Sequence, residues 1–150
     1  MIYKCEHFHL VELLPKLFYN DNITKYKDNL WGLFDLRLLI TLDRLRKRYG
    51  KTYMNDWKWG GNNDSKGFRP PEDYEGAKLS QHRFGRAADP KFELVTADEV
   101  REDLKKNPND STFEYITTIE DGQIAKTWFH FDTRNWDKTT NGILVVKPIG

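Results

Sequence analysis

Sulfur is scarce in this sequence, which has a single cysteine, Cys5. One cysteine excludes a disulfide within the chain, and it excludes zinc sites built from several thiolates. A chain of 150 residues buries enough apolar surface to fold without a disulfide or a structural metal. We therefore expect any bound metal to be catalytic and not structural. Its ligands would be histidine and carboxylate side chains, because these are the metal-binding groups that the chain has in place of several thiolates.

The sequence also lacks an excess of one charge. Its 24 lysine and arginine residues are balanced by 23 aspartate and glutamate residues, for a net charge of +1. This balance gives no electrostatic reason to expect a polyanion, so we predict no nucleic-acid partner. The basic run at residues 44–48 is explained by its place at the end of a predicted helix.

Long apolar runs are missing as well, and no segment approaches the ~18 apolar residues of a membrane span, so we predict none. The first residues, MIYKCEHFHLVELLP, lack the apolar region and the cleavage site of a secretory signal. We therefore expect synthesis in the cytoplasm. A substrate outside the cell would be reached only if another device delivered the protein.

What is present in the first half of the chain is a helical pattern. Residues 9–19 predict a short helix, in which Pro15 either occupies the first turn or breaks the helix. The strongest helix runs from a predicted N-cap at Asp35 to a stop at Gly50, with leucines repeated along one face. The segment 51–57 has the composition of a strand.

The second half mixes a long loop with short elements. Residues 58–79 form a loop rich in glycine, asparagine and proline, and loops of this length in a small domain are often functional. Thr96 and Glu99 form a capping box for a helix of about ten residues.

Three strands are predicted after this helix. Residues 113–119 and 124–133 flank the turn signal Glu120-Asp121-Gly122 and predict a hairpin, and residues 143–148 predict a last strand. The sum is one monomeric α+β domain over 1–150, with a small antiparallel sheet, flanking helices and an N-terminal arm at 1–30.

Three residues qualify as metal ligands. His82 and Asp89 lie close together in SQHRFGRAADP, and His130 lies in TWFHFD, where strand alternation puts Trp128, His130 and Asp132 on one face. Two histidines and one carboxylate suit zinc with an open position. The residue types alone leave a second interpretation open, in which His82 is a loop residue and His130 a core residue bonded to the backbone.

The same residues carry a resemblance to a known family. SQHRFGRAADP resembles the S-x-H-x-x-G-x-A-x-D signature of the zinc D-alanyl-D-alanine carboxypeptidases and L-alanyl-D-glutamate endopeptidases, which are relatives of VanX and of the hedgehog signalling domain. The fixed positions are matched by Ser80, His82, Gly85, Ala87 and Asp89.

Two further motifs agree with this family. Trp128-Phe129-His130 is similar to the second histidine motif, and Arg69 in GFRPP matches an upstream arginine. The resemblance covers about residues 34–136 and is greatest to small single-domain members from phages and prophages.

The resemblance implies a hedgehog-type fold and a zinc ion held by His82, Asp89 and His130. It implies a peptidase that uses zinc-activated water to cut peptidoglycan stem peptides, either at the D-Ala-D-Ala end or at an L-Ala-D-Glu-type bond. Arg69 would hold a substrate carboxylate or the developing oxyanion, and Ser80 would lie near the substrate. A phage-type lysis role would then bring the protein to the cell wall.

The sequence departs from the family at Thr127, where many members have the glutamate or aspartate that acts as general base. Asp132 is the first candidate to replace it. The alternative is that Asp132 orients a ligating histidine, while Glu120 and Asp121 are interpreted as turn residues. The departure keeps open a zinc-binding module without catalysis, and the bulk composition is also compatible with a metal-free interaction domain.

Overall fold

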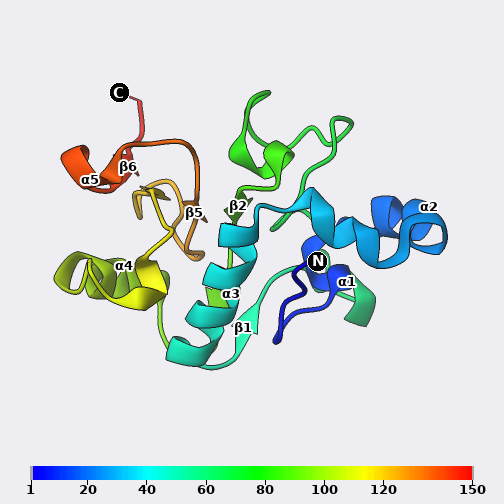
Figure 1. Ribbon diagram of the computed structural model, residues 1–150, viewed down its shortest axis with the longest axis horizontal. Helices are drawn as coiled ribbons and strands as arrows, with labels where there is room; N and C mark the ends of the chain where they lie inside the picture. The colour runs from blue at the N-terminus through cyan, green and yellow to red at the C-terminus, as the bar shows by residue number, and fades with distance from the viewer. Residues whose placement is uncertain (1, 150) are drawn as a thin grey trace.

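The computed structural model describes residues 2–149 and has the α+β composition that the sequence predicts. In Figure 1 helix α3 (Leu36–Tyr49) crosses the middle of the molecule, with α4 (Ala97–Lys106) on one side and α1 (Leu10–Leu13) and α2 (Lys16–Tyr26) on the other. A short helix, α5 (Lys138–Asn141), lies near the C-terminus. Four 3-10 turns complete the helical elements among the described residues: η1 (Lys27–Leu33), η2 (Trp57–Trp59), η3 (Gln81–Phe84) and η4 (Ser111–Phe113).

Helix α3 has the boundaries that its end signals predict. The Asp35 side chain accepts a hydrogen bond from the backbone N–H of Arg37 at 2.9 Å, and Gly50 ends the helix with a positive φ of 82°. The apolar face is buried in the core through Leu38, Leu39, Leu42 and Leu45. Helix α4 likewise begins at the predicted capping box, in which Thr96 and Glu99 bond reciprocally.

The N-terminal residues are divided by Pro15, which breaks the predicted helix. α1 ends at Leu13, and Pro15 becomes the N-cap residue of α2, because proline lacks the N–H that a continuing helix would need. Apolar residues from this region share the core with α3, among them Phe8, Leu13 and Leu30.

The strands are short and form two sheets among the described residues. β1 (Thr52–Tyr53) pairs with β3 (Lys91–Phe92). The second sheet has the order β2-β5-β4-β6 and consists of β2 (Ala87–Ala88), β5 (Phe131–Asp132), β4 (Thr118–Glu120) and β6 (Leu144–Val146). The prediction of an antiparallel sheet is wrong at one position, since β4 and β6 are parallel. The chain crosses over through 133–143 and α5 before β6, which is the kind of connection that parallel neighbours require.

The predicted hairpin at 113–133 is correct in its pairing and wrong in its extent. Thr118 pairs with Asp132 and Ile119 with Phe131, but residues 121–130 form a loop. The buried guanidinium of Arg101, on α4, donates to the carbonyl oxygens of Glu120, Ala125 and Trp128. A side chain therefore satisfies backbone groups that a longer strand ladder would have used.

Among residues 2–149, no helix has the length and apolar character required to cross a membrane.

Candidate metal centre

His82 is held in place by a tight turn. It lies in η3, where the Ser80 side chain accepts a hydrogen bond from the His82 N–H, and Gly85 ends the turn with φ +66°. A Cβ atom on Gly85 would lie 1.9 Å from the carbonyl oxygen of Leu33, so both conformation and space require glycine. The turn leads directly into β2, and this brings His82 back toward Asp89.

Asp89 follows β2 and is 5% exposed. Its N–H donates to the carbonyl oxygen of Lys66 at 2.9 Å, which attaches this residue to the long 58–79 loop. β2 ends before Pro90 and lies at the edge of the sheet, where a proline is tolerated because its missing N–H is not needed by a neighbouring strand.

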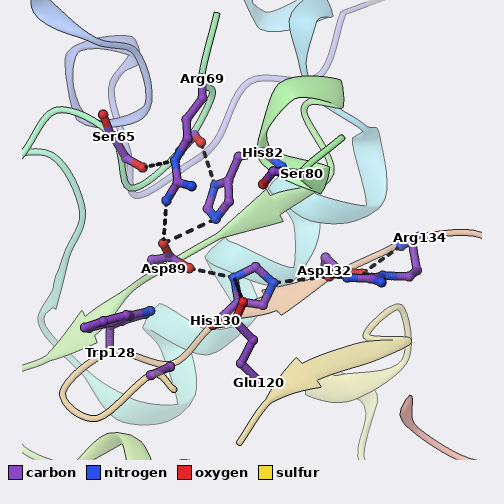
Figure 2. A network of polar contacts seen from close by, with 12 residues as sticks. Ser65, Arg69, Ser80, His82, Asp89, Glu120, Trp128, His130, Asp132 and Arg134 are labelled. Carbon is purple, nitrogen blue, oxygen red and sulfur yellow. Dashed lines mark hydrogen bonds and ion pairs between the residues drawn. The ribbon is translucent and has the colours of Figure 1, made fainter. Parts of the chain in front are cut away.

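The structure brings the three predicted ligands together. One Asp89 oxygen lies 2.7 Å from His130 Nδ1, and the other lies 3.2 Å from His82 Nε2 (Figure 2). All three residues are buried, and their ligand atoms lie within 4.8 Å of one another. Among the described residues they form a His-Asp-His group that can hold a metal ion.

The remaining ring nitrogens explain why this group suits a cation. His82 Nδ1 donates to the carbonyl oxygen of Gly67 at 2.8 Å, because a carbonyl can only accept. His130 Nε2 lies 3.1 Å from an Asp132 oxygen and donates to it. In the neutral form that a metal requires, each ring would direct its remaining lone pair toward Asp89, which is how metal-ligating histidines are oriented in proteins. The donor set of two nitrogens and one carboxylate fits zinc.

The electrostatics of the group point in the same direction. Burial alone would lower the pKa of His130, but the hydrogen bonds to Asp132 and Asp89 raise it to about 10. Burial alone would raise the pKa of Asp89, but the charges and hydrogen bonds of His82 and His130 hold it below its usual range. The site therefore stabilises positive charge next to Asp89, which a metal cation supplies.

Asp132 lies behind His130 and is fully buried. Arg134 binds both of its oxygens, at 2.8 and 2.6 Å, while His130 Nε2 bonds to one of them (Figure 2). Burial alone would raise the pKa of Asp132, but the bonds from Arg134 and His130 lower it. This geometry matches the alternative in which Asp132 orients a ligating histidine.

Arg69 lies on the other side of the group. Its Nη2 donates to Asp89 at 3.1 Å and its Nε donates to the Ser65 carbonyl oxygen at 2.9 Å. Its Nη1 forms no hydrogen bond with another described residue. Gly76, with φ +75°, passes so close that a Cβ there would lie 2.6 Å from Nη1. Glycine is therefore the residue that leaves room for Nη1, and Arg69 lines the cavity beside the three candidate ligands, where its guanidinium can meet a ligand.

A cavity of about 380 Å³ opens beside the three ligands. Its walls include Arg69, Ser80, His82, Asp89, Glu120, Trp128, His130 and Arg134. We call it the first cavity. Asp132 is not among its lining residues, which agrees with its complete burial.

Glu120 is the residue that sequence reasoning passed over. It is the last residue of β4, and its N–H bonds to the His130 carbonyl oxygen at 3.4 Å, so the two residues lie opposite each other. Its carboxylate lies 3.9 Å from His130 Nδ1. Apart from Asp89, it is the one carboxylate that lines the first cavity. The register of the hairpin was the only available signal, since the composition of the segment around Glu120 favoured a turn.

Thr127 is exposed and does not line the first cavity. His7 and His9 are also exposed and lie outside the His-Asp-His group.

Comparison of the chain with protein-family models, with curated proteins and with solved structures found no match.

Proposed function

We propose that this protein is a zinc-dependent peptidase that hydrolyses an amide bond in peptidoglycan stem peptides. The observation that supports this most directly is the convergence of His82 Nε2, His130 Nδ1 and Asp89 beside a cavity that also contains Arg69 and Glu120. The motif resemblance supplies the substrate class and the expected hedgehog-type fold, and the chain's own residues supply the chemistry.

In this proposal, His82, Asp89 and His130 hold the zinc ion. When bound, zinc polarises a carbonyl group and lowers the pKa of water toward ~7, so that hydroxide is available at neutral pH. Arg69 binds a substrate carboxylate or the developing oxyanion from the cavity wall, since its charge is permanent and its donors lie in a plane. Ser80 supports the turn of His82 and contributes a hydroxyl to the cavity wall.

Glu120 is the general base in this proposal. Its carboxylate lies within the cavity and beside His130, whereas the oxygens of Asp132 are already occupied by Arg134 and His130. A base must reach the proton that it removes, and an occupied carboxylate behind a ligand does not. Asp132 then fixes the ring of His130.

The decisive experiment is a digestion of purified peptidoglycan by the protein with zinc and with chelator. We expect new amino termini and soluble peptides, identified by mass spectrometry, only with zinc. A protein that holds one zinc per chain and releases nothing is the non-catalytic zinc module. If the protein retains no zinc, both the zinc peptidase and the zinc-binding module are excluded, and the metal-free interaction domain is the remaining function.

The two carboxylates are separated by matched amide variants. We expect Glu120→Gln to lower kcat by roughly 10²- to 10⁴-fold while zinc binding is kept, because only the proton acceptor is lost. Asp132→Asn is expected to weaken zinc binding by roughly 10- to 100-fold, with activity restored by excess zinc. Zinc titration and steady-state kinetics measure both effects. The opposite pattern would assign the base to Asp132.

A further inference from the structure

One wall of the first cavity is a loop that contains neither helix nor strand. We call residues 70–79 the wall loop, and Gly76, Ala77 and Leu79 are its members that line the cavity. Residues 71–79 are exposed apart from Asp73, which is half-buried. Because so little of the wall loop is buried, its position must depend on hydrogen bonds.

Arg83, in η3, supplies most of these bonds. Its guanidinium donates to four carbonyl oxygens of the wall loop, which are those of Pro70 at 2.9 Å, Asp73 at 2.6 Å, Ala77 at 3.3 Å and Glu75 at 3.4 Å. Among residues 2–149, the one other side chain outside the wall loop that bonds to it is Ser65, whose hydroxyl donates to the Asp73 carboxylate at 2.8 Å. The bonds of Arg83 require an arginine, because its five N–H groups are fixed in one plane, whereas the three donors of a lysine leave from a single atom.

The wall loop also lies against Arg69. A Cβ atom on Gly76 would lie 2.6 Å from Arg69 Nη1, so the backbone of the wall loop leaves little space beside this nitrogen. The other two nitrogens of the guanidinium donate to the Ser65 carbonyl oxygen and to Asp89 (Figure 2). The wall loop therefore limits the movement of the one guanidinium nitrogen that has no hydrogen bond to another described residue.

We propose that Arg83 is a positioning residue, which holds the wall loop and thereby fixes the guanidinium of Arg69 beside the His-Asp-His group. This inference rests on the proposed peptidase function, in which Arg69 binds the substrate. Arg83 follows His82 in the sequence but is not among the residues that line the first cavity. Its effect on the substrate therefore passes through the wall loop and Arg69.

The kinetic test is a double-mutant cycle on the zinc-loaded protein with a synthetic stem pentapeptide. We expect Arg83→Lys to lower kcat/KM by roughly 10- to 100-fold at unchanged zinc affinity, because a small displacement of a substrate-binding group is costly. In the Arg69→Gln background, the same substitution should change kcat/KM by less than about twofold, because the residue through which it acts is gone.

Two further variants separate positioning from a general loss of stability. Gly76→Ala places a methyl group in the space of Arg69 Nη1 and should lower kcat/KM as Arg83→Lys does, again only when Arg69 is present. Arg48→Lys is the matched control. Arg48 also donates to several acceptors, on Asp103 and Asp110, but it does not line the first cavity. It should leave kcat/KM unchanged.

The position of Arg69 can also be measured without activity. Because Arg69 Nε donates to the Ser65 carbonyl oxygen, its N–H signal in a proton–nitrogen NMR spectrum should be separate from the signals of exposed arginines. Its absence in Arg69→Gln assigns it. In Arg83→Lys and in Gly76→Ala this signal should move toward those of the exposed arginines, and in Arg48→Lys it should stay in place.

The outcomes separate the positioning role from the peptidase function. An unmoved Arg69 signal in Arg83→Lys, or an equal effect of Arg83→Lys with and without Arg69, would overturn the positioning role and leave the peptidase standing. If the wild type cuts no peptide, the peptidase proposal fails. The NMR signal then decides the positioning of Arg69 alone, as it does where a variant cuts too slowly to measure: a moved signal supports it, and an unmoved one overturns it.

Discussion

Asp43 and Asp89 are two buried carboxylates of similar exposure, 3% and 5%, with opposite surroundings. Asp43, on α3, accepts hydrogen bonds from the Tyr3 hydroxyl at 2.8 Å and from the N–H groups of Glu6 and His7 at 2.9 and 3.1 Å. All three partners are fixed donors. Asp43 therefore attaches the N-terminal segment to α3, and its bonds are complete without a ligand.

Asp89 faces a different set of atoms. Two of its neighbours are ring nitrogens, and the second nitrogen of each ring already donates elsewhere, to Gly67 and to Asp132. Burial is therefore the same in both places, while the donors differ. A buried carboxylate whose partners are all donors holds a fold together, whereas Asp89, which has one donor in Arg69 and faces two ring nitrogens, is suited to a cation.

The comparison is tested most severely by removing the two rings that face Asp89. We expect His82→Ala/His130→Ala to lower zinc affinity by more than about 10³-fold, because two of three ligands are lost. Metal analysis after dialysis should fall from one zinc per chain to none, and peptidase activity should disappear. His7→Ala/His9→Ala is the matched control and should keep the zinc. Zinc retained by the first variant and lost by the second would place the metal elsewhere.

The two aspartates can be compared directly through matched asparagine variants. Asp43→Asn should lower the free energy of unfolding by about 2–3 kcal/mol, with and without zinc, because a buried acceptor of three bonds is weakened. It should keep the stabilisation by zinc, which is about 4 kcal/mol at free zinc a thousandfold above its dissociation constant. Asp89→Asn should lose that stabilisation.

Denaturant unfolding with zinc and with chelator measures both quantities. The comparison would be wrong if Asp43→Asn abolished the effect of zinc or if Asp89→Asn preserved it.

The smallest expected effect extends the comparison to a carboxylate near the surface. Asp103 on α4 accepts bonds from Arg48, Tyr49 and Asn107. The bonds from Arg48 are the main cause that lowers the pKa of Asp103, which burial alone would raise. The stabilisation is present above the unfolded pKa of about 3.9 and is lost as the pH falls through the lower pKa of the folded protein.

On acidification from about pH 5 to about pH 2, the wild type should therefore lose about 1 kcal/mol more stability than Asp103→Asn. Thermal unfolding across this pH range measures the difference. Equal losses in the two proteins would mean that the Arg48 bonds contribute nothing to stability.

The features with local signals were predictable from the sequence. The ends of α3 and α4 follow from Asp35, Gly50 and the Thr96 capping box, since a cap acts on N–H groups only a few residues away. The three candidate ligands were predictable because metal chemistry restricts residue types and the motif restricts their spacing. The structure brings the three side chains together in a group that could hold a metal ion.

The features that depend on distant partners were not predictable. Residues 124–130 have the composition of a strand, and Arg101 on α4 holds them in a loop. Glu120 looked like a turn residue until the register of β4 and β5 placed it opposite His130.

The sequence by itself determined the candidate ligands, the ends of α3 and α4 and the α+β class, because each depends on residue chemistry or on neighbours along the chain. Only the tertiary structure decided which carboxylate stands free beside the ligands. Glu120 and Asp132 are the same kind of acid, and what separates them is that Arg134 and His130 occupy one while the other lines an open cavity.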